Sequence, residues 1–216
     1  MKSLKKAAFG AVCATLIAAP AFMMGAGNAT ESVEAAAKLS IGDKAPDFTL
    51  VDLNGEEHTL SDYTAAGNTV VLEWFSPSCP FVIKHYREDT GTMNKIAADH
   101  AENNVVWLRI NSGHTKHSSA DKALNIKTAS EWNIETPILM DGSGEVGKSY
   151  GAKRTPDMYI IGADGTLLYH GAIDNRSDAA APGKVNYVAN ALEEINAGKK
   201  ISKPETKPYG CSVKYD

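Results

Sequence analysis

The stretch that decides the fold is Val70-Val71-Leu72-Glu73-Trp74-Phe75-Ser76-Pro77-Ser78-Cys79-Pro80. Residues 70–75 are apolar apart from Glu73, which is typical of a strand that is buried on both faces of a sheet. Pro80 suits the first position of a helix, because the N–H that proline lacks would have no partner there. The stretch therefore predicts a strand, a short turn and a helix, with Cys79 at or beside the helix N-cap.

The predicted position of Cys79 indicates a reactive residue. Free backbone N–H groups and the positive end of the helix dipole stabilise a thiolate at a helix N-terminus. The thiolate is the nucleophilic form of cysteine. We therefore expect Cys79 to act as a nucleophile, and the alternative is a buried structural cysteine, which is common for this residue type.

Residues 1–29 have the pattern of a secretory signal peptide: a basic start, an apolar run and a series of small residues. A retained membrane anchor is the alternative, but Pro20 and several glycines interrupt the apolar run. Cys13 would be lost with the signal peptide. Residues 30–40 are predicted to be a linker.

Cleavage would leave about 187 residues, which is enough for one domain with a sizeable core. These residues hold 19 Lys and Arg against 26 Asp and Glu, a net charge of about −7. Such a surface does not suggest nucleic acid or anionic lipid as a partner. No second apolar stretch is long enough to span a bilayer, so no stable membrane insertion is expected after cleavage. The predicted location is the periplasm, and nothing in the sequence sets the oligomeric state.

The rest of the chain alternates between strand and helix patterns. They predict a hairpin over 48–60, a helix over 80–102 with a bend at 90–92, a strand over 105–110, a helix over 121–133, a strand over 137–140, a helix over 145–150, strands over 158–161 and 166–169, and a helix over 185–197. This order predicts an α/β fold with a mixed central sheet between helices and an N-terminal β-hairpin extension. The predicted domain covers 41–198, and a polar tail over 199–216 carries Cys211.

Pro156 stands directly before the apolar strand 158–161. Proline cannot donate a hydrogen bond to a strand ladder, so its place there needs an explanation. A cis Thr155–Pro156 peptide bond at a turn into the strand would supply one, and the alternative is an ordinary trans proline in a turn.

Three motifs in this order resemble the thioredoxin superfamily, and within it the redoxins of the alkyl hydroperoxide reductase / thiol-specific antioxidant group, in an exported form. The first motif is 74–80, the second is 154–161 and the third is Asp164-Gly165 followed by 167–171. The resemblance covers roughly 39–195. It implies a thioredoxin-like fold in which the Thr–cis-Pro segment faces the reactive cysteine.

The chain departs from this family at several positions. Val82 stands where thioredoxins have the second cysteine of C-x-x-C, so the usual local resolving thiol is missing. Ser76 stands where peroxiredoxins have the threonine of Thr-x-x-Cys. Leu72 stands where peroxiredoxins usually have a proline, and Pro156 aligns with their arginine, with Arg154 two residues away.

Cys211 lies 132 residues after Cys79 and follows a glycine in the polar tail. One interpretation is a resolving cysteine that forms a disulfide with an oxidised or substrate-linked Cys79. A second is a permanent disulfide that pins the tail. A third is a free or intermolecular thiol.

Several side chains are candidates for supporting roles. Lys84 and His85 follow Cys79 closely and are candidates for lowering its pKa, and the alternative is a solvated basic face. Glu73 lies on the buried strand, and the resemblance implies a buried carboxylate that accepts the proton of the reactive cysteine. The alternative for Glu73 is an ion pair with a lysine.

The sequence does not predict a cofactor or a metal. His114 and His117, together with Cys79 and His85, raise a copper-handling alternative, since Sco-type copper chaperones share the fold. Those proteins use two nearby cysteines, and the second thiol is absent here. Residues 142–144 form too short a glycine-containing segment for a dinucleotide loop.

The sequence therefore predicts an exported thiol-dependent oxidoreductase with antioxidant or peroxidase-like activity. Cys79 is the expected nucleophile and Cys211 the expected resolving residue, while Ser76, Thr155 and Pro156 shape the substrate side. The expected partner is a thiol reductant or a small peroxide or disulfide substrate. The alternatives are protein thiol–disulfide exchange and a non-catalytic binding module with a structural disulfide.

Overall fold

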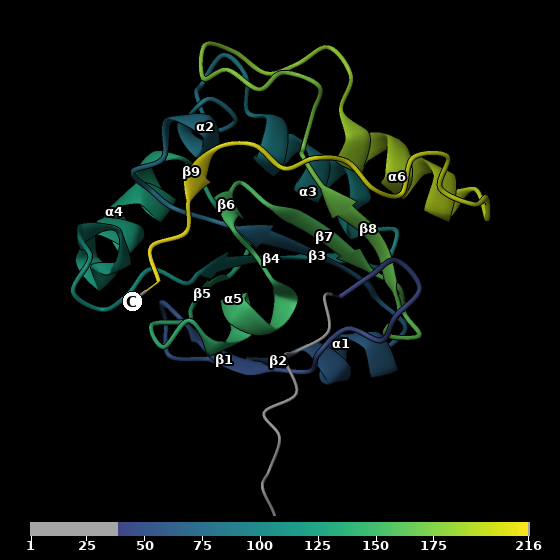
Figure 1. Ribbon diagram of the computed structural model, residues 1–216, viewed down its shortest axis with the longest axis horizontal. Helices are drawn as coiled ribbons and strands as arrows, with labels where there is room; N and C mark the ends of the chain where they lie inside the picture. The colour runs from purple at the N-terminus through teal and green to yellow at the C-terminus, as the bar shows by residue number, and fades with distance from the viewer. Residues whose placement is uncertain (1–38, 216) are drawn as a thin grey trace, which may run out of the picture. The chain divides into compact units, whose positions relative to one another are not determined.

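The computed structural model describes residues 39–215 of the 216-residue chain. The predicted signal peptide and most of the predicted linker lie outside the described residues. In chain order the elements are β1 (Thr49–Asp52), β2 (Glu57–Thr59), α1 (Leu60–Ala65), β3 (Thr69–Trp74), α2 (Pro80–Ile83), α3 (Thr92–Ala101), β4 (Val105–Asn111), a 3-10 turn (Ser118–Ala120), α4 (Lys122–Glu131), β5 (Ile138–Met140), α5 (Glu145–Tyr150), β6 (Arg154–Thr155), β7 (Met158–Ile161), β8 (Leu167–Gly171), α6 (Tyr187–Asn196) and β9 (Cys211–Ser212) (Figure 1).

One mixed sheet forms the centre of the fold, with the strand order β2-β1-β5-β4-β3-β7-β8. The strands β3, β4 and β5 are parallel to one another. By contrast, β7 runs antiparallel to both β3 and β8, and β1 runs antiparallel to both β2 and β5. The predicted α/β class, mixed sheet and N-terminal hairpin are confirmed.

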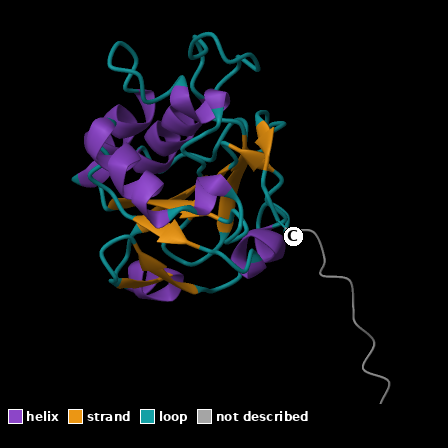
Figure 2. Ribbon diagram, turned by 90° about the vertical axis from the view of Figure 1, so that its left-hand side faces the viewer, coloured by secondary structure: helices purple, strands orange, loops and turns teal. Residues whose placement is uncertain are grey.

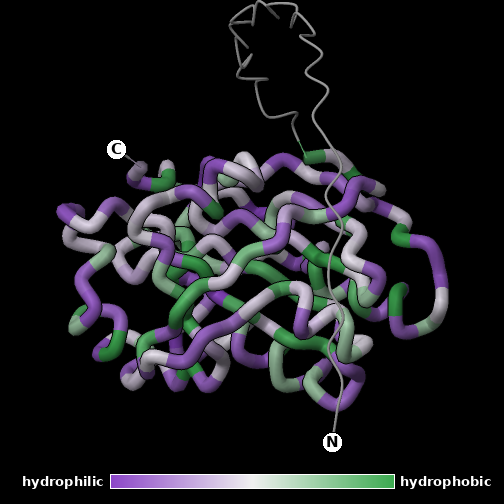
Figure 3. The backbone as a smooth tube through the Cα atoms, turned by 90° about the horizontal axis from the view of Figure 1, so that it is seen from below, coloured by the Kyte–Doolittle hydropathy of each residue, from purple (hydrophilic) through white to green (hydrophobic). Residues whose placement is uncertain are grey.

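Helices cover both faces of this sheet (Figures 1 and 2). Alternate residues of a strand point to opposite faces. Accordingly, Val71 and Phe75 pack in a cluster with apolar residues of α3 and α6, whereas Val70 and Leu72 pack with residues of α1 and α5. Hydrophobic residues are concentrated in the strands that cross the middle of the molecule (Figure 3). The strand that leads to Cys79 is therefore held rigidly from both sides.

The predicted helix over 80–102 is wrong as a single helix. Helix α2 ends at Ile83, and the next residues form turns in which His85 N donates to the carbonyl oxygen of Val82 and Tyr86 N to that of Ile83. Helix α3 begins only after Gly91, which has a left-handed φ of 48°. The chain thus changes direction just after Cys79, and this change brings Lys84 and His85 into the interior.

A buried polar network lies on the α3 side of β3, around Glu73. Its carboxylate accepts hydrogen bonds from the Tyr86 hydroxyl at 2.7 and 2.9 Å and from Trp107 Nε1 at 3.0 Å. The Arg109 Nε atom lies 3.4 Å from Glu73 Oε2, and both side chains are fully buried. Burial raises the pKa of Glu73, and the Arg109 charge opposes that rise. Glu73 therefore forms an ion pair, as the alternative interpretation has it, but its partner is an arginine instead of a lysine.

Replacing Glu73 by glutamine should destabilise the fold by about 3–5 kcal/mol, because it leaves the Arg109 charge buried without a counter-charge. Urea unfolding at pH 7 measures this loss. The exposed pair Lys95–Asp99, with 2.8 Å between Lys95 Nζ and Asp99 Oδ2, supplies the control. Asp99→Asn should cost less than about 1 kcal/mol. Equal losses for the two variants would contradict the role given to the Glu73–Arg109 pair.

Candidate active site

Cys79 is the N-cap residue of α2, and Pro80 occupies the first helical turn, as the sequence predicts. The backbone N–H groups of Val82 and Ile83 both donate to the carbonyl oxygen of Cys79 at 2.9 Å. Because β3 ends at Trp74, only a short turn separates the buried strand from this cysteine. The side chain is 2% exposed.

The Thr155–Pro156 peptide bond is cis, which confirms the prediction from the sequence. It places the carbonyl oxygen of Thr155 beside α2, where the Cys79 thiol donates to it over 3.0 Å. The Thr155 segment therefore faces Cys79, as the resemblance implies.

The C-terminal tail adds a strand at this point, which the sequence does not predict. Strand β9 pairs antiparallel with β6, with Cys211 opposite Thr155 and Ser212 opposite Arg154 (Figure 1). The pairing places Cys211 Sγ 2.9 Å from Cys79 Sγ. Both cysteines are free thiols in this structure. The tail thus supplies the second thiol that the C-x-x-C position lacks.

Gly210 makes this close approach possible. Its φ is 117°, in the region that favours glycine, and an added Cβ would overlap the carbonyl oxygen of Thr155. Any other residue at this position would push β9 away from β6. The glycine before Cys211 is therefore part of the site.

Tyr209 anchors the tail two residues before Cys211. Its hydroxyl donates to Asp174 Oδ1 over 2.6 Å and lies 3.2 Å from His85 Nε2. The Lys84 ammonium nitrogen lies 4.4 Å from the centre of the Tyr209 ring. These contacts hold the chain where it turns into β9.

Lys84 and His85 therefore serve the tail anchor. The Lys84 ammonium group donates to the carbonyl oxygens of Arg176 and Asp178 at 2.6 and 2.9 Å. Burial lowers the pKa of His85 to about 4, so its ring is neutral at pH 7. The expectation that these two side chains act directly on Cys79 is not supported by their contacts.

Of the remaining residues predicted for the site, one lies beside the cysteines and two make other contacts. Ser76 lines the cavity next to both cysteines. The guanidinium group of Arg154 donates to the carbonyl oxygen of Gly210 over 3.4 Å and so supports the tail. Glu73 makes its contacts within the buried network described above, which gives no support to a proton-acceptor role for Cys79.

The surroundings of Cys211 affect its ionisation. Burial, and then the neighbouring Cys79, raise the pKa of Cys211 to about 11. Cys211 therefore keeps its proton at neutral pH.

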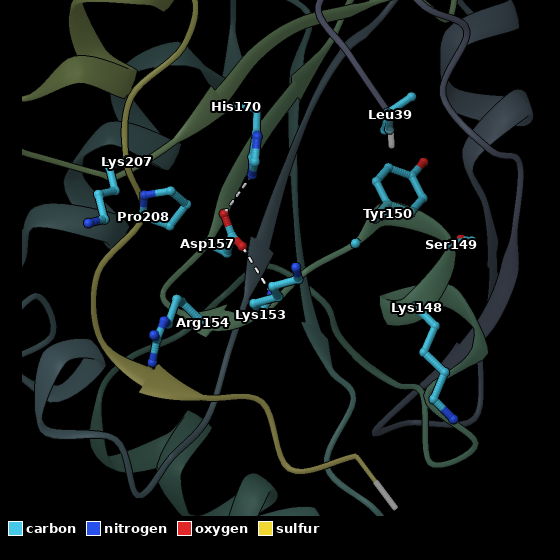
Figure 4. Close-up of a pocket in the computed structure, with 11 residues that line it drawn as sticks. Leu39, Lys148, Ser149, Tyr150, Lys153, Arg154, Asp157, His170, Lys207 and Pro208 are labelled. Carbon is cyan, nitrogen blue, oxygen red and sulfur yellow. Dashed lines mark hydrogen bonds and ion pairs between the residues drawn. The ribbon is translucent and has the colours of Figure 1, made fainter. Parts of the chain in front are cut away.

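A small cavity of about 180 Å³ lies beside both sulfur atoms. Many of the residues that line it are polar, among them Ser76, Ser112, His117 and Thr155. The largest cavity described, about 400 Å³, contains neither cysteine. Figure 4 shows residues that line it, among them Asp157 and His170, which are joined by a hydrogen bond of 3.1 Å between Oδ1 and Nε2.

The histidines of the copper alternative do not join Cys79 in one group. In residues 39–215, the only cluster of three potential ligands is Asp52, Glu56 and His58, on the β1–β2 hairpin. The His117 ring instead bonds to Ser119 at 2.7 Å. The copper alternative therefore has no structural support.

Sequence analysis did not identify Tyr209, Asp174 or Gly210 as site residues. The glycine directly before Cys211 was the one local signal. Tyr209 and Asp174 are 35 residues apart, and their contact exists only in the folded chain.

Over residues 39–215, no helix combines the length and apolar character needed to cross a bilayer.

Comparison with known proteins agrees with the resemblance inferred from the motifs. The family model described as AhpC/TSA family matches residues 41–170. The chain is 30% identical over 130 residues to the thiol-disulfide oxidoreductase ResA of Geobacillus thermodenitrificans, covering 60% of this chain and 67% of that protein.

Two solved structures extend the similarity. An uncharacterized conserved protein from Geobacillus kaustophilus has a TM-score of 0.73 at 28% identity, covering 82% of this chain and 93% of that one. A hypothetical protein from Sinorhizobium meliloti has a TM-score of 0.72 at 25% identity, covering 83% and 97%. Cys211 lies outside the segment that the family model matches. The chain belongs to the AhpC/TSA family, in the thioredoxin superfamily, and is a thiol-dependent oxidoreductase.

Proposed function

We propose that this protein catalyses thiol–disulfide exchange and that Cys79 and Cys211 alternate between a dithiol and a disulfide. The observation that carries the proposal is the 2.9 Å distance between the two sulfur atoms across the β6–β9 pairing. The relative named as a thiol-disulfide oxidoreductase also favours exchange over the peroxide reduction that the sequence favoured.

The reaction has two steps. The Cys79 thiolate attacks one sulfur of a substrate disulfide, forms a mixed disulfide and releases the first substrate thiol, which takes up a proton. The Cys211 thiolate then attacks the sulfur of Cys79 and releases the second substrate thiol. The substrate gains two electrons, the protein becomes a Cys79–Cys211 disulfide, and an external thiol reductant restores the dithiol.

The position of Arg154 gives peroxide reduction less support. Arg154 is the only arginine near the position expected from peroxiredoxins, and its guanidinium group is engaged with the tail at Gly210. Ser76 remains beside the cysteines, but the cavity wall contains no arginine.

The proposed place of work is outside the cytoplasm. The basic, apolar and small-residue segments of residues 1–29 support export. An oxidising compartment would also allow the Cys79–Cys211 disulfide to form and persist until the thiol reductant acts.

Trapping the mixed disulfide tests the assignment of the two cysteines. With 2-hydroxyethyl disulfide, Cys211→Ser should stop at an adduct of one substrate thiol on Cys79. Under the same conditions Cys79→Ser should form an adduct on Cys211 much more slowly, because burial raises the pKa of Cys211 and leaves little of it as thiolate at pH 7, and the unmodified protein should lose two hydrogens. Intact mass after acid quenching distinguishes these products. Equal reaction of the two variants would contradict the order of attack.

Moving β9 should slow the second step without removing either thiol. We expect Gly210→Ala to slow formation of the Cys79–Cys211 bond at least about tenfold, since the added methyl group overlaps the carbonyl oxygen of Thr155. Gly55→Ala is the matched control, because Gly55 has a φ of 93° with open space around it. Quenched-flow mass spectrometry follows both rates. Similar behaviour of the two variants would show that β9 docking is not required.

The second step should also depend on pH. Only the thiolate of Cys211 attacks, and burial holds the pKa of this thiol above its ordinary value, so the rate of the second step should rise about tenfold per pH unit above pH 7. Raising the pH has the opposite effect on the stability of the docked tail. The protonated thiol favours the docked tail below pH 9, and this contribution is lost as the pH rises through about 11. A second step that does not change between pH 7 and 9 would refute the raised pKa.

A further inference from the structure

We propose that the 180 Å³ cavity beside Cys79 and Cys211 is the substrate site, and that the substrate is a small polar disulfide without positive charge. This inference rests on the proposed thiol–disulfide exchange and names its substrate class. The inference excludes an extended segment of a protein as the substrate while the tail is docked.

The backbone edge next to the cysteines is already occupied. An extended peptide binds to such an edge through main-chain hydrogen bonds. Here β9 makes those bonds to β6, and Val213 N also donates to the carbonyl oxygen of Lys153 at 3.1 Å. With Cys79 only 2% exposed, a peptide could reach its sulfur only by removing β9.

The tail is held on both sides of β9, so its removal would break several contacts. Before β9, Tyr209 is bonded to Asp174, as described above. After β9, the carbonyl oxygen of Lys214 accepts a hydrogen bond from His114 N at 2.7 Å, and the Tyr215 hydroxyl donates to the carbonyl oxygen of Ala152 at 2.8 Å. The docked tail is therefore a fixed wall of the site.

The size of the cavity limits what can enter beside this wall. Pockets for drug-sized ligands usually have volumes of about 300–1,000 Å³. The cavity next to the cysteines has about 180 Å³. A compact disulfide with a few atoms on each side of the sulfurs matches this space, whereas a folded protein or a bulky aromatic disulfide does not.

The chemistry of the wall indicates a polar substrate. Thr155 is 3% exposed, and its Oγ1 finds no hydrogen-bond partner among the described residues. A buried hydroxyl without a partner is uncommon and unfavourable. Thr155 is one of the residues that line the cavity, and turning its side chain would let this hydroxyl bond to a polar group of the substrate.

The charge of the wall indicates which polar substrates fit. No carboxylate is among the residues that line the cavity, whereas Lys214 contributes a cation. A neutral or anionic disulfide is therefore favoured over a cationic one of the same size. In the exchange reaction, one small disulfide and two protein thiols give two small thiols and the Cys79–Cys211 disulfide.

The experiment compares substrates of different size and charge in the full protein. Formation of the Cys79–Cys211 bond is followed by quenched-flow mass spectrometry with 2-hydroxyethyl disulfide, with cationic cystamine and with an extended disulfide-linked peptide dimer. We expect the neutral small disulfide to react at least about tenfold faster than the peptide and faster than cystamine. In Gly210→Ala, the first attack on the peptide should accelerate, since β9 no longer covers the edge.

Thr155 variants test the binding role of the cavity. Thr155→Val should raise the KM for 2-hydroxyethyl disulfide about fivefold or more and leave the second step unchanged, while Thr155→Ser should retain the original KM. Thr136→Val is the matched control, because Thr136 Oγ1 is also buried without a partner but lies away from this cavity.

The outcomes separate this inference from the proposed function. A peptide that reacts as fast as the small disulfide in the unmodified protein would overturn the substrate class but retain disulfide exchange. A KM unchanged by Thr155→Val would overturn the assignment of the cavity. If neither the small disulfides nor the peptide produced the Cys79–Cys211 bond, the proposed disulfide exchange and the proposed substrate class would both fail.

Discussion

The backbone of Thr155 is the constraint on which the active site depends. Its carbonyl oxygen accepts a hydrogen bond from the Cys79 thiol. On the other side, its strand β6 pairs with β9, which places Cys211 opposite Thr155. The cis peptide bond to Pro156 and the glycine at 210 allow both approaches. The two sulfur atoms therefore meet at one residue, although 132 positions separate them in the chain.

Burial then gives the surrounding charged groups their roles. The turn after α2 carries Lys84 and His85 into the interior, where they meet Asp174 and the ring of Tyr209. Burial keeps the His85 ring neutral and raises the pKa of Cys211. The polar groups that seemed from the sequence to serve the first cysteine instead hold the second one in place.

Sequence patterns predicted the framework well because the framework follows from local preferences. Neighbouring residues in the sequence were enough to predict three local conformations. These are the buried strand over 70–75, the helix that starts at Pro80 and the turn at Pro156 before a strand. The hairpin at Asn54-Gly55 is of the same kind. The predicted helix over 80–102 failed, because the turns after Ile83 depend on burial of the residues that follow it.

By itself, the sequence determined the α/β order, the place of Cys79 at a helix N-cap and the cis peptide bond before Pro156. Only the tertiary structure decided that the tail pairs with β6, that Tyr209 is anchored on Asp174 and that Glu73 is paired with Arg109. The physical reason is the range of the interactions. Caps, turns and strand patterns act between neighbours in the chain, whereas the edge of β6 acquires its partner from a segment more than fifty residues away.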